Sequence, residues 1–89
     1  MRLSGWLICA DLAEVATIQR HLPDHLQLSR SEPGCLAFDV WQTADPLMWR
    51  VEEHFSSAAA FDEHQRRTRG SNWWAATAAI AREYAVDDG

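Results

Sequence analysis

The 89-residue chain lacks lysine, and its eight positive charges are all arginines, against thirteen acidic residues. The formal net charge of −5 argues against nucleic-acid binding, which uses clustered positive charge. Hydrophobic residues make up 47% of the chain and charged residues 24%, a composition that excludes intrinsic disorder. Long apolar runs are also missing, because no stretch approaches the roughly 18 residues of a membrane span. We therefore expect a folded chain that binds neither nucleic acid nor membrane.

Cysteine is scarce as well. Cys9 and Cys35 are the only two, and they form no C-x-x-C pair. We expect both to be reduced and buried, as in a cytoplasmic protein. The apolar N-terminal stretch is interrupted by two small residues and ends at Asp11, which is too short for an export signal. The sequence thus predicts a single cytoplasmic domain over residues 1–89.

The spacing of apolar residues alternates between two and about 3.6 along the chain, which predicts strands and helices in a definite order. Leu3–Ala10 is apolar on both faces, as in a central strand. Asp11 should cap a helix with Glu14 as its reciprocal partner, and Pro23 should kink or split that helix near Leu22. The predicted inner stripe of this helix is Leu12, Val15, Gln19, Leu22, Leu26 and Ser29.

Two segments with period-two alternation, Cys35–Gln42 and Leu47–Phe55, flank a four-residue turn and predict a hairpin. A register that places Asp39 opposite Arg50 joins opposite charges and pairs apolar residues with one another. One face is then apolar apart from Glu53. The apolar members of that face are Leu36, Phe38, Val40, Trp49, Val51 and Phe55.

The other face of the predicted hairpin mixes Trp41 and Met48 with charged residues. Such a face is too apolar for open solvent and too charged for the core of a monomer. A second copy of the chain covering it is the economical explanation, so we predict a homodimer formed through the sheet face.

Two further helices and a strand complete the predicted fold. Ser56–Ser57 can cap a helix that runs to about Arg69, Ser71 can cap a shorter one, and Arg82–Val86 forms the last strand. The order is β-α-β-β-α-β with the second helix in two pieces. This order predicts the α+β class and a ferredoxin-like fold, an antiparallel sheet with helices on one face.

Two blocks of the sequence resemble the antibiotic biosynthesis monooxygenase (ABM) family. Ser31–Val40 is similar to the family's turn and second strand, and Val51–His64 is similar to its entry into the second helical region. The resemblance is to the quinol-monooxygenase-like branch of the dimeric α+β barrel superfamily. It implies two subunits with facing sheets and, in each subunit, a pocket between the sheet and the second helical region.

The resemblance implies a cofactor-independent monooxygenase that oxidises a small electron-rich aromatic, a quinol or phenolic polyketide, with O2. His64 stands where a His is frequent in this branch, and a His can take a phenolic proton near neutral pH. Glu53 is the second catalytic candidate, or else a structural anchor paired with Arg82 or with backbone N–H groups. The predicted substrate-binding residues are Trp49, Val51, Phe55, Phe61, Trp73 and Trp74.

Two alternative functions follow from the same residues. Val51, Phe55 and Phe61 stand where the anthrone oxygenases of the family have polar or redox-active side chains, which favours a non-catalytic ligand-binding or accessory dimer. The Arg66–Arg69 segment could hold a phosphate or carboxylate. An isomerase of a small phosphorylated substrate would need that segment to face the pocket.

We predict neither a cofactor nor a metal. The haem-degrading relatives need an Asn on the first strand and a Trp at the position of His64, and residues 1–12 contain no Asn. His21 and His25 have the i,i+4 spacing of a metal-binding pair. We expect them on the solvated outer face of the first helix, without a third ligand.

Overall fold

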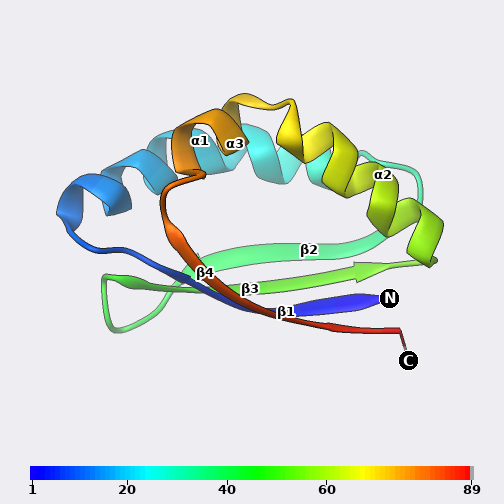
Figure 1. The fold of residues 1–89 in the computed structure, drawn as a ribbon, viewed down its shortest axis with the longest axis horizontal. Helices are drawn as coiled ribbons and strands as arrows, with labels where there is room; N and C mark the ends of the chain where they lie inside the picture. The colour runs from blue at the N-terminus through cyan, green and yellow to red at the C-terminus, as the bar shows by residue number, and fades with distance from the viewer. Residues whose placement is uncertain (89) are drawn as a thin grey trace.

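The computed structural model describes residues 1–88, which form a four-stranded antiparallel sheet with three helices on one face (Figure 1). The elements are β1 (Arg2–Ile8), α1 (Leu12–Arg30), β2 (Cys35–Gln42), β3 (Met48–Phe55), α2 (Ala58–Arg69), α3 (Asn72–Thr77) and β4 (Ala81–Asp87). The strand order β2-β3-β1-β4 places β1 in the interior of the sheet, as predicted. The predicted ferredoxin-like α+β fold is confirmed. Gly89, the end of the predicted domain, lies outside the described residues.

Helix α1 begins at the predicted cap. The Asp11 side chain accepts a hydrogen bond from Glu14 N at 3.0 Å, and Glu14 Oε1 accepts one from Ala10 N at 2.7 Å. The predicted split of the helix at Pro23 is wrong, because α1 is continuous from Leu12 to Arg30. Both Pro23 and Gln19, whose carbonyl loses its helical donor to the proline ring, are exposed, so water can satisfy that carbonyl.

The face that α1 packs on the sheet differs from the predicted stripe. Its buried residues are Val15, Ile18, Leu22, His25 and Ser29. The prediction omitted Ile18 and included Leu12 and Gln19, both of which are exposed. It also placed His25 on the outer face, whereas this side chain is only 5% exposed. Both stripes advance in steps of three and four residues, so the spacing alone did not distinguish them, and packing on the sheet selected the observed one.

The register of β2 and β3 is two residues away from the predicted one. Asp39 lies opposite Glu52 rather than Arg50. Thr43 N donates to Met48 O at 3.0 Å and closes the turn. The predicted turn closed between Gln42 and Leu47, so each side of the observed turn closes one residue later. A shift of two keeps every side chain on its face, so the predicted apolar face persists. The charge pair predicted for the hairpin does not form.

The helix-facing side of the sheet forms the core. Its buried apolar residues include Leu3, Leu7, Phe38, Val40, Trp49, Val51 and Phe55. Leu36 was predicted there but is 60% exposed, because a β-bulge at the start of β2 turns it outward. Cys9 and Cys35 are both free, and Cys9 is buried as predicted, whereas Cys35 is only partly buried. None of the helices in residues 1–88 is long and apolar enough to cross a membrane.

A glycine allows β4 to approach β1 closely. Gly5 lies opposite Tyr84 in the pairing of these strands. A Cβ at Gly5 would lie 2.0 Å from Glu83 O and 2.7 Å from Tyr84 Cδ1. Because the first of these atoms belongs to the backbone, only separation of the strands could relieve the clash. The absence of a side chain at Gly5 thus sets the position of Tyr84.

Candidate active site

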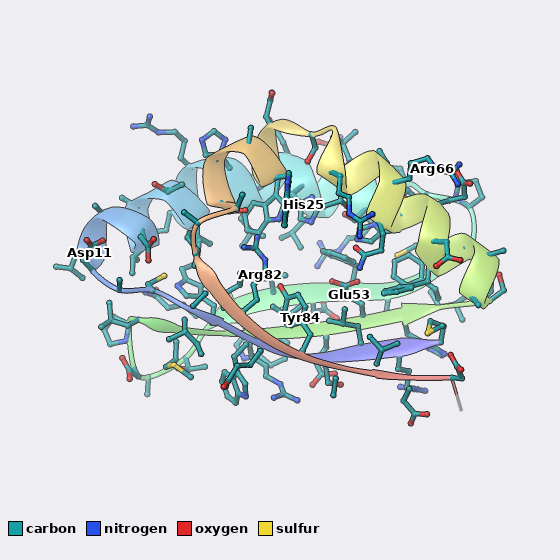
Figure 2. All side chains as sticks on the ribbon, in the orientation of Figure 1. Asp11, His25, Glu53, Arg66, Arg82 and Tyr84 are labelled. Atoms are coloured by element: carbon teal, nitrogen blue, oxygen red, sulfur yellow. The ribbon has the colours of Figure 1, made fainter. Side chains whose placement is uncertain are left out.

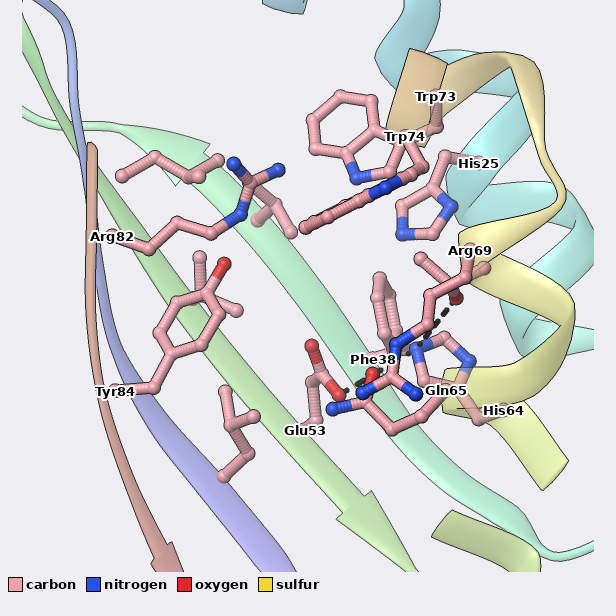
Figure 3. Close-up of a pocket in the computed structure, with 15 residues that line it drawn as sticks. His25, Phe38, Glu53, His64, Gln65, Arg69, Trp73, Trp74, Arg82 and Tyr84 are labelled. Carbon is pink, nitrogen blue, oxygen red and sulfur yellow. Dashed lines mark hydrogen bonds and ion pairs between the residues drawn. The ribbon is translucent and has the colours of Figure 1, made fainter. Parts of the chain in front are cut away.

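A cavity of about 220 Å³ lies between the sheet and the helices. His25, Glu53, Arg82 and Tyr84 point into the space between these layers, whereas Asp11 lies at the outside (Figure 2). The polar residues that line the cavity are His25, Glu53, His64, Gln65, Thr68, Arg69, Arg82 and Tyr84 (Figure 3). Strand β3, helix α2 and strand β4 thus each contribute ionisable groups to one space.

The predicted site residues divide into two groups. Those that line the cavity are Val51, Glu53, His64, Trp73 and Trp74. Trp49, Phe55 and Phe61 are buried in the core and do not line it. Trp73 is buried, whereas the adjacent Trp74 is 36% exposed at the cavity mouth, since neighbouring helical residues point about 100° apart.

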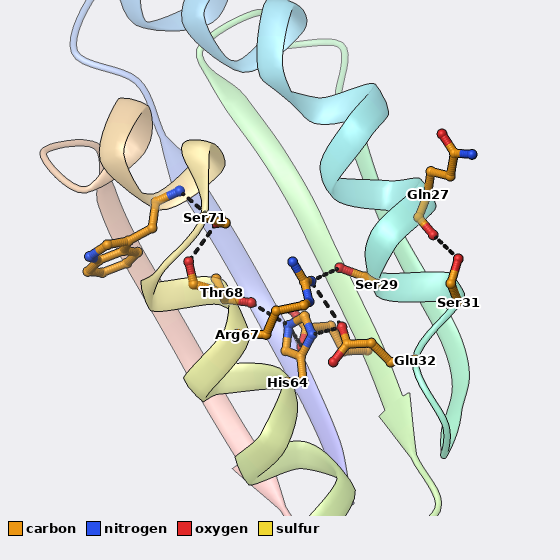
Figure 4. A network of polar contacts seen from close by, with 10 residues as sticks. Gln27, Ser29, Ser31, Glu32, His64, Arg67, Thr68 and Ser71 are labelled. Carbon is orange, nitrogen blue, oxygen red and sulfur yellow. Dashed lines mark hydrogen bonds and ion pairs between the residues drawn. The ribbon is translucent and has the colours of Figure 1, made fainter.

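His64 is oriented by a carboxylate that the sequence analysis missed (Figure 4). Its Nδ1 lies 2.7 Å from Glu32 Oε1, while its Nε2 lies 3.3 Å from Thr68 Oγ1 and 3.7 Å from Glu53 Oε1. A carboxylate only accepts hydrogen bonds, so it holds the proton of a neutral imidazole on Nδ1. The Nε2 lone pair is then directed toward Thr68 and Glu53. This is the arrangement of an oriented general base.

Glu32 is itself held in place by α1 and α2. Arg67 Nη2 donates to Glu32 Oε1 at 2.9 Å and to Ser29 Oγ at 3.1 Å (Figure 4). The chain Arg67–Glu32–His64 therefore links the turn after α1 to two successive turns of α2. Such a doubly held carboxylate restricts the orientation of the imidazole ring.

The arginines of the predicted Arg66–Arg69 cluster face three different surroundings. Arg66 pairs with Glu63 at 2.7 Å on the exposed surface, and Arg67 pairs with Glu32. Arg69 is the one member of the cluster that lines the cavity. The isomerase alternative requires the whole cluster to face the cavity. The cluster does not, because only Arg69 among its members lines the cavity.

Burial governs the protonation of Glu53 and His64. Burial and, to a smaller extent, the charge of Glu32 raise the pKa of Glu53 to about 8. Burial also lowers the pKa of His64, although the hydrogen bond and charge of Glu32 oppose this effect. Both groups are therefore predominantly uncharged at neutral pH. A carboxylic acid and an imidazole then face each other at 3.7 Å.

Glu53 lacks the partner that the sequence analysis expected. The basic side chain that lies within 4 Å of its carboxyl is the neutral His64 rather than Arg82, and 3.7 Å is too long for a hydrogen bond. Its Oε1 is buried and has no hydrogen-bond partner within residues 1–88. Leaving such a group unsatisfied is costly, so a ligand hydroxyl in the cavity would supply a missing interaction.

His25 and Trp73 form the inner wall of the cavity. Their rings stack with centroids 4.7 Å apart and an interplanar angle of 3°, and the His25 ring lies 5.9 Å from that of His64. Burial and the nearby His64 lower the pKa of His25 to about 3, so it is neutral at physiological pH. His21 and His25 do not share a solvated face, and residues 1–88 contain no group of three metal-binding side chains.

Sequence reasoning missed Glu32, His25 and Tyr84 as cavity-associated residues. His25 carried a signal, since it continues the i, i+3, i+4 spacing of Ile18 and Leu22. Glu32 also carried a signal, since it lies in the Ser31–Val40 block that resembles the ABM family, whereas Tyr84 carried none, because its position depends on the pairing of β4.

The family of the chain follows from comparison with known proteins. The family model described as antibiotic biosynthesis monooxygenase (ABM) matches residues 12–75, which is most of the chain. The protein therefore belongs to the ABM family. No curated protein matches it at a significant level.

Several solved structures share the fold. A Nitrosomonas europaea protein, provisionally described as an antibiotic biosynthesis monooxygenase, is 19% identical with a TM-score of 0.83, covering 100% of this chain and 98% of that one. A Bacteroides thetaiotaomicron protein with the same provisional description is 19% identical, with a TM-score of 0.81 and coverages of 98% and 88%. Rv0793 from Mycobacterium tuberculosis is 20% identical, with a TM-score of 0.70 and coverages of 97% and 92%. At these identities the likeness establishes the fold alone.

Proposed function

We propose that this protein is a cofactor-independent monooxygenase that oxidises a small electron-rich aromatic, a quinol or phenol, with O2. One observation carries the proposal: the oriented Nε2 of His64 lies beside the uncharged, unsatisfied carboxyl of Glu53 in a cavity that also has aromatic walls. Membership of the ABM family supports the type of reaction.

The size of the cavity supports a substrate with a single aromatic ring. A cavity of about 150 Å³ is sufficient for benzene, whereas pockets for drug-sized ligands begin at about 300 Å³. The present cavity, at about 220 Å³, therefore suits a substituted single ring. A larger polyketide would extend through the mouth beside Trp74 and Tyr84, both of which are partly exposed.

In the proposed reaction, His64 Nε2 takes the phenolic proton and Glu32 stabilises the resulting imidazolium. The protonated Glu53 donates a hydrogen bond to a substrate oxygen. The phenolate passes one electron to O2, and recombination forms a C–O bond at a ring carbon that carries hydrogen. The hydroperoxide then loses water, so that C–H becomes C=O. A quinol and O2 give a hydroxyquinone and water, with all atoms accounted for.

The first test is O2 consumption by the purified protein with 1,4-dihydroxybenzene and 1,4-dihydroxynaphthalene. We expect uptake above the autoxidation background and, with ¹⁸O2, one labelled oxygen atom in the organic product. Unlabelled quinone accompanied by hydrogen peroxide would identify an oxidase and contradict the monooxygenase proposal. Binding of the quinols without any O2 uptake would instead support the non-catalytic ligand-binding alternative, which the apolar Val51 in the cavity lining favours.

We also propose that the single domain acts as a homodimer through the sheet face opposite the helices. On that face Trp41 is 46% exposed, and the guanidinium of Arg50 lies 4.8 Å over the Trp6 ring. Covering these aromatic groups would remove apolar surface from water. Sedimentation at the mass of two chains is the expected result, and Trp41→Glu should shift it toward one chain. A wild-type monomer at micromolar concentration would contradict the proposal.

A further inference from the structure

We propose that the cavity end formed by Arg82 and Tyr84 binds a carboxylate carried by the aromatic substrate. Arg82 and Tyr84 come from β4, whereas His64 enters from α2 on the other side of the cavity (Figure 3). The inference rests on the proposed function and names its substrate class, a hydroxylated aromatic acid.

Arg82 is a fixed cation in the cavity wall. Its Nη1 donates to Thr77 O at 2.7 Å and to Ile80 O at 2.9 Å, and its Nη2 donates to Thr77 Oγ1 at 2.8 Å. The guanidinium carbon lies 5.0 Å over the Trp74 ring. These contacts hold the side chain against the end of α3, so its direction is set before any ligand enters.

The charge of Arg82 is not neutralised by the protein. All three acceptors of its hydrogen bonds are uncharged, and no carboxylate within residues 1–88 forms an ion pair with it. The three bonds leave two of the five donors, the Nε–H and one Nη2 hydrogen, for the Tyr84 hydroxyl, which also forms a hydrogen bond with Arg82, and for a ligand. Because Nε and Nη2 form one edge of the guanidinium, they match the two oxygens of a planar carboxylate.

Tyr84 adds a neutral donor to the same end. Burial raises the pKa of its hydroxyl, and the charge of Arg82 and a hydrogen bond with it partly oppose that rise, so the phenol keeps its proton at neutral pH. Its ring is positioned by the close packing of β4 on Gly5. The hydroxyl lies next to Arg82 in the view of the cavity (Figure 3). A carboxylate there would meet one cation and one O–H donor.

The order of groups across the cavity matches one kind of ligand. The His64–Glu53 end suits a phenolic hydroxyl, the Arg82–Tyr84 end suits an anion, and the lining also contains apolar groups such as Val51 and the Trp73 ring. An aromatic acid presents this sequence of hydroxyl, ring and carboxylate. A neutral quinol would leave the guanidinium of Arg82 without an anionic partner.

The test is isothermal titration calorimetry without O2, so that binding is measured apart from turnover. The probes are 2,5-dihydroxybenzoate, its uncharged methyl ester and phenyl phosphate. We expect the acid to bind roughly ten- to hundred-fold more tightly than the ester, the range typical of a charge-assisted hydrogen bond. Equal affinities for acid and ester would overturn the proposal, and tighter binding of phenyl phosphate would overturn the carboxylate assignment.

Three variants locate the effect. Arg82→Gln should abolish the preference for the acid while the ester still binds, and Tyr84→Phe should reduce the preference about three- to tenfold. Arg66→Gln is the matched control, since Arg66 pairs with Glu63 on the exposed surface and should leave the preference unchanged. If Arg82→Gln fails to fold, Tyr84→Phe decides, because it removes one hydroxyl and keeps the packed ring; an unchanged preference there overturns the proposal. Failure of the oxygenase assay leaves these binding results interpretable.

Discussion

Replacing His64 by glutamine is expected to lower quinol turnover by about 10²- to 10⁴-fold, because it removes the base that takes the phenolic proton. Glutamine retains a polar side chain of similar length, so the variant tests basicity more than volume. The measurement is the initial rate of O2 consumption at saturating quinol, with the far-ultraviolet circular dichroism of the variant as a check on folding. Undiminished turnover in a folded His64→Gln protein would remove His64 from the mechanism.

The same mechanism predicts that Glu32, which orients His64, also affects turnover. Glu32→Gln leaves the imidazole in place but removes the charge that fixes the Nδ1 proton and stabilises the imidazolium. We expect turnover about ten- to hundred-fold lower and an altered pH–rate profile. Glu63→Gln is the control, since Glu63 pairs only with Arg66 on the surface. If Glu32 were merely structural, the pH–rate profile of its variant would coincide with that of wild type.

Replacing Glu53 by glutamine is expected to stabilise the fold increasingly as the pH rises from about 4.5 to 8. The pKa of Glu53 is raised from 4.5 to about 8 in the folded state. Below pH 4.5 both states hold the proton. Between the two values the unfolded state releases it while the folded state keeps it, so wild-type stability falls with rising pH. The expected gain of Glu53→Gln over wild type at pH 8 is roughly 3–5 kcal/mol, at about 1.4 kcal/mol per pKa unit.

Urea unfolding of both proteins at pH 5, 6.5 and 8 measures this difference. His25 acts in the opposite sense: its pKa is lowered to about 3, so its contribution is lost as the pH falls from 6.5 toward 3. Comparison at each pH cancels that contribution, because both proteins retain His25. Free energies of unfolding that run parallel with pH would show that Glu53 is ionised in the folded protein, and the uncharged pair with His64 would then be wrong.

The local sequence determined where the helices begin. Asp11 caps α1 as predicted, with Glu14 accepting from Ala10 N rather than from Asp11 N, and the side chains of Ser57 and Ser71 accept the backbone N–H groups of Ala60 and Trp74. These signals act over three or four residues, so no distant partner is needed to interpret them. The side chains on each face of a strand could also be predicted locally, because their alternation is unchanged when the register shifts by two residues.

Only the tertiary structure determined which groups meet in the cavity. Glu32 and His64 are 32 positions apart and touch because the turn after α1 packs on α2. The hairpin register depended on where its turn closed, and the docking of α1 on the sheet selected the stripe that contains His25 over the predicted stripe, although both have helical spacing. Arg82 reaches the cavity only through the pairing of β4 with β1. Such contacts depend on packing between segments far apart in the chain, which local spacing does not encode.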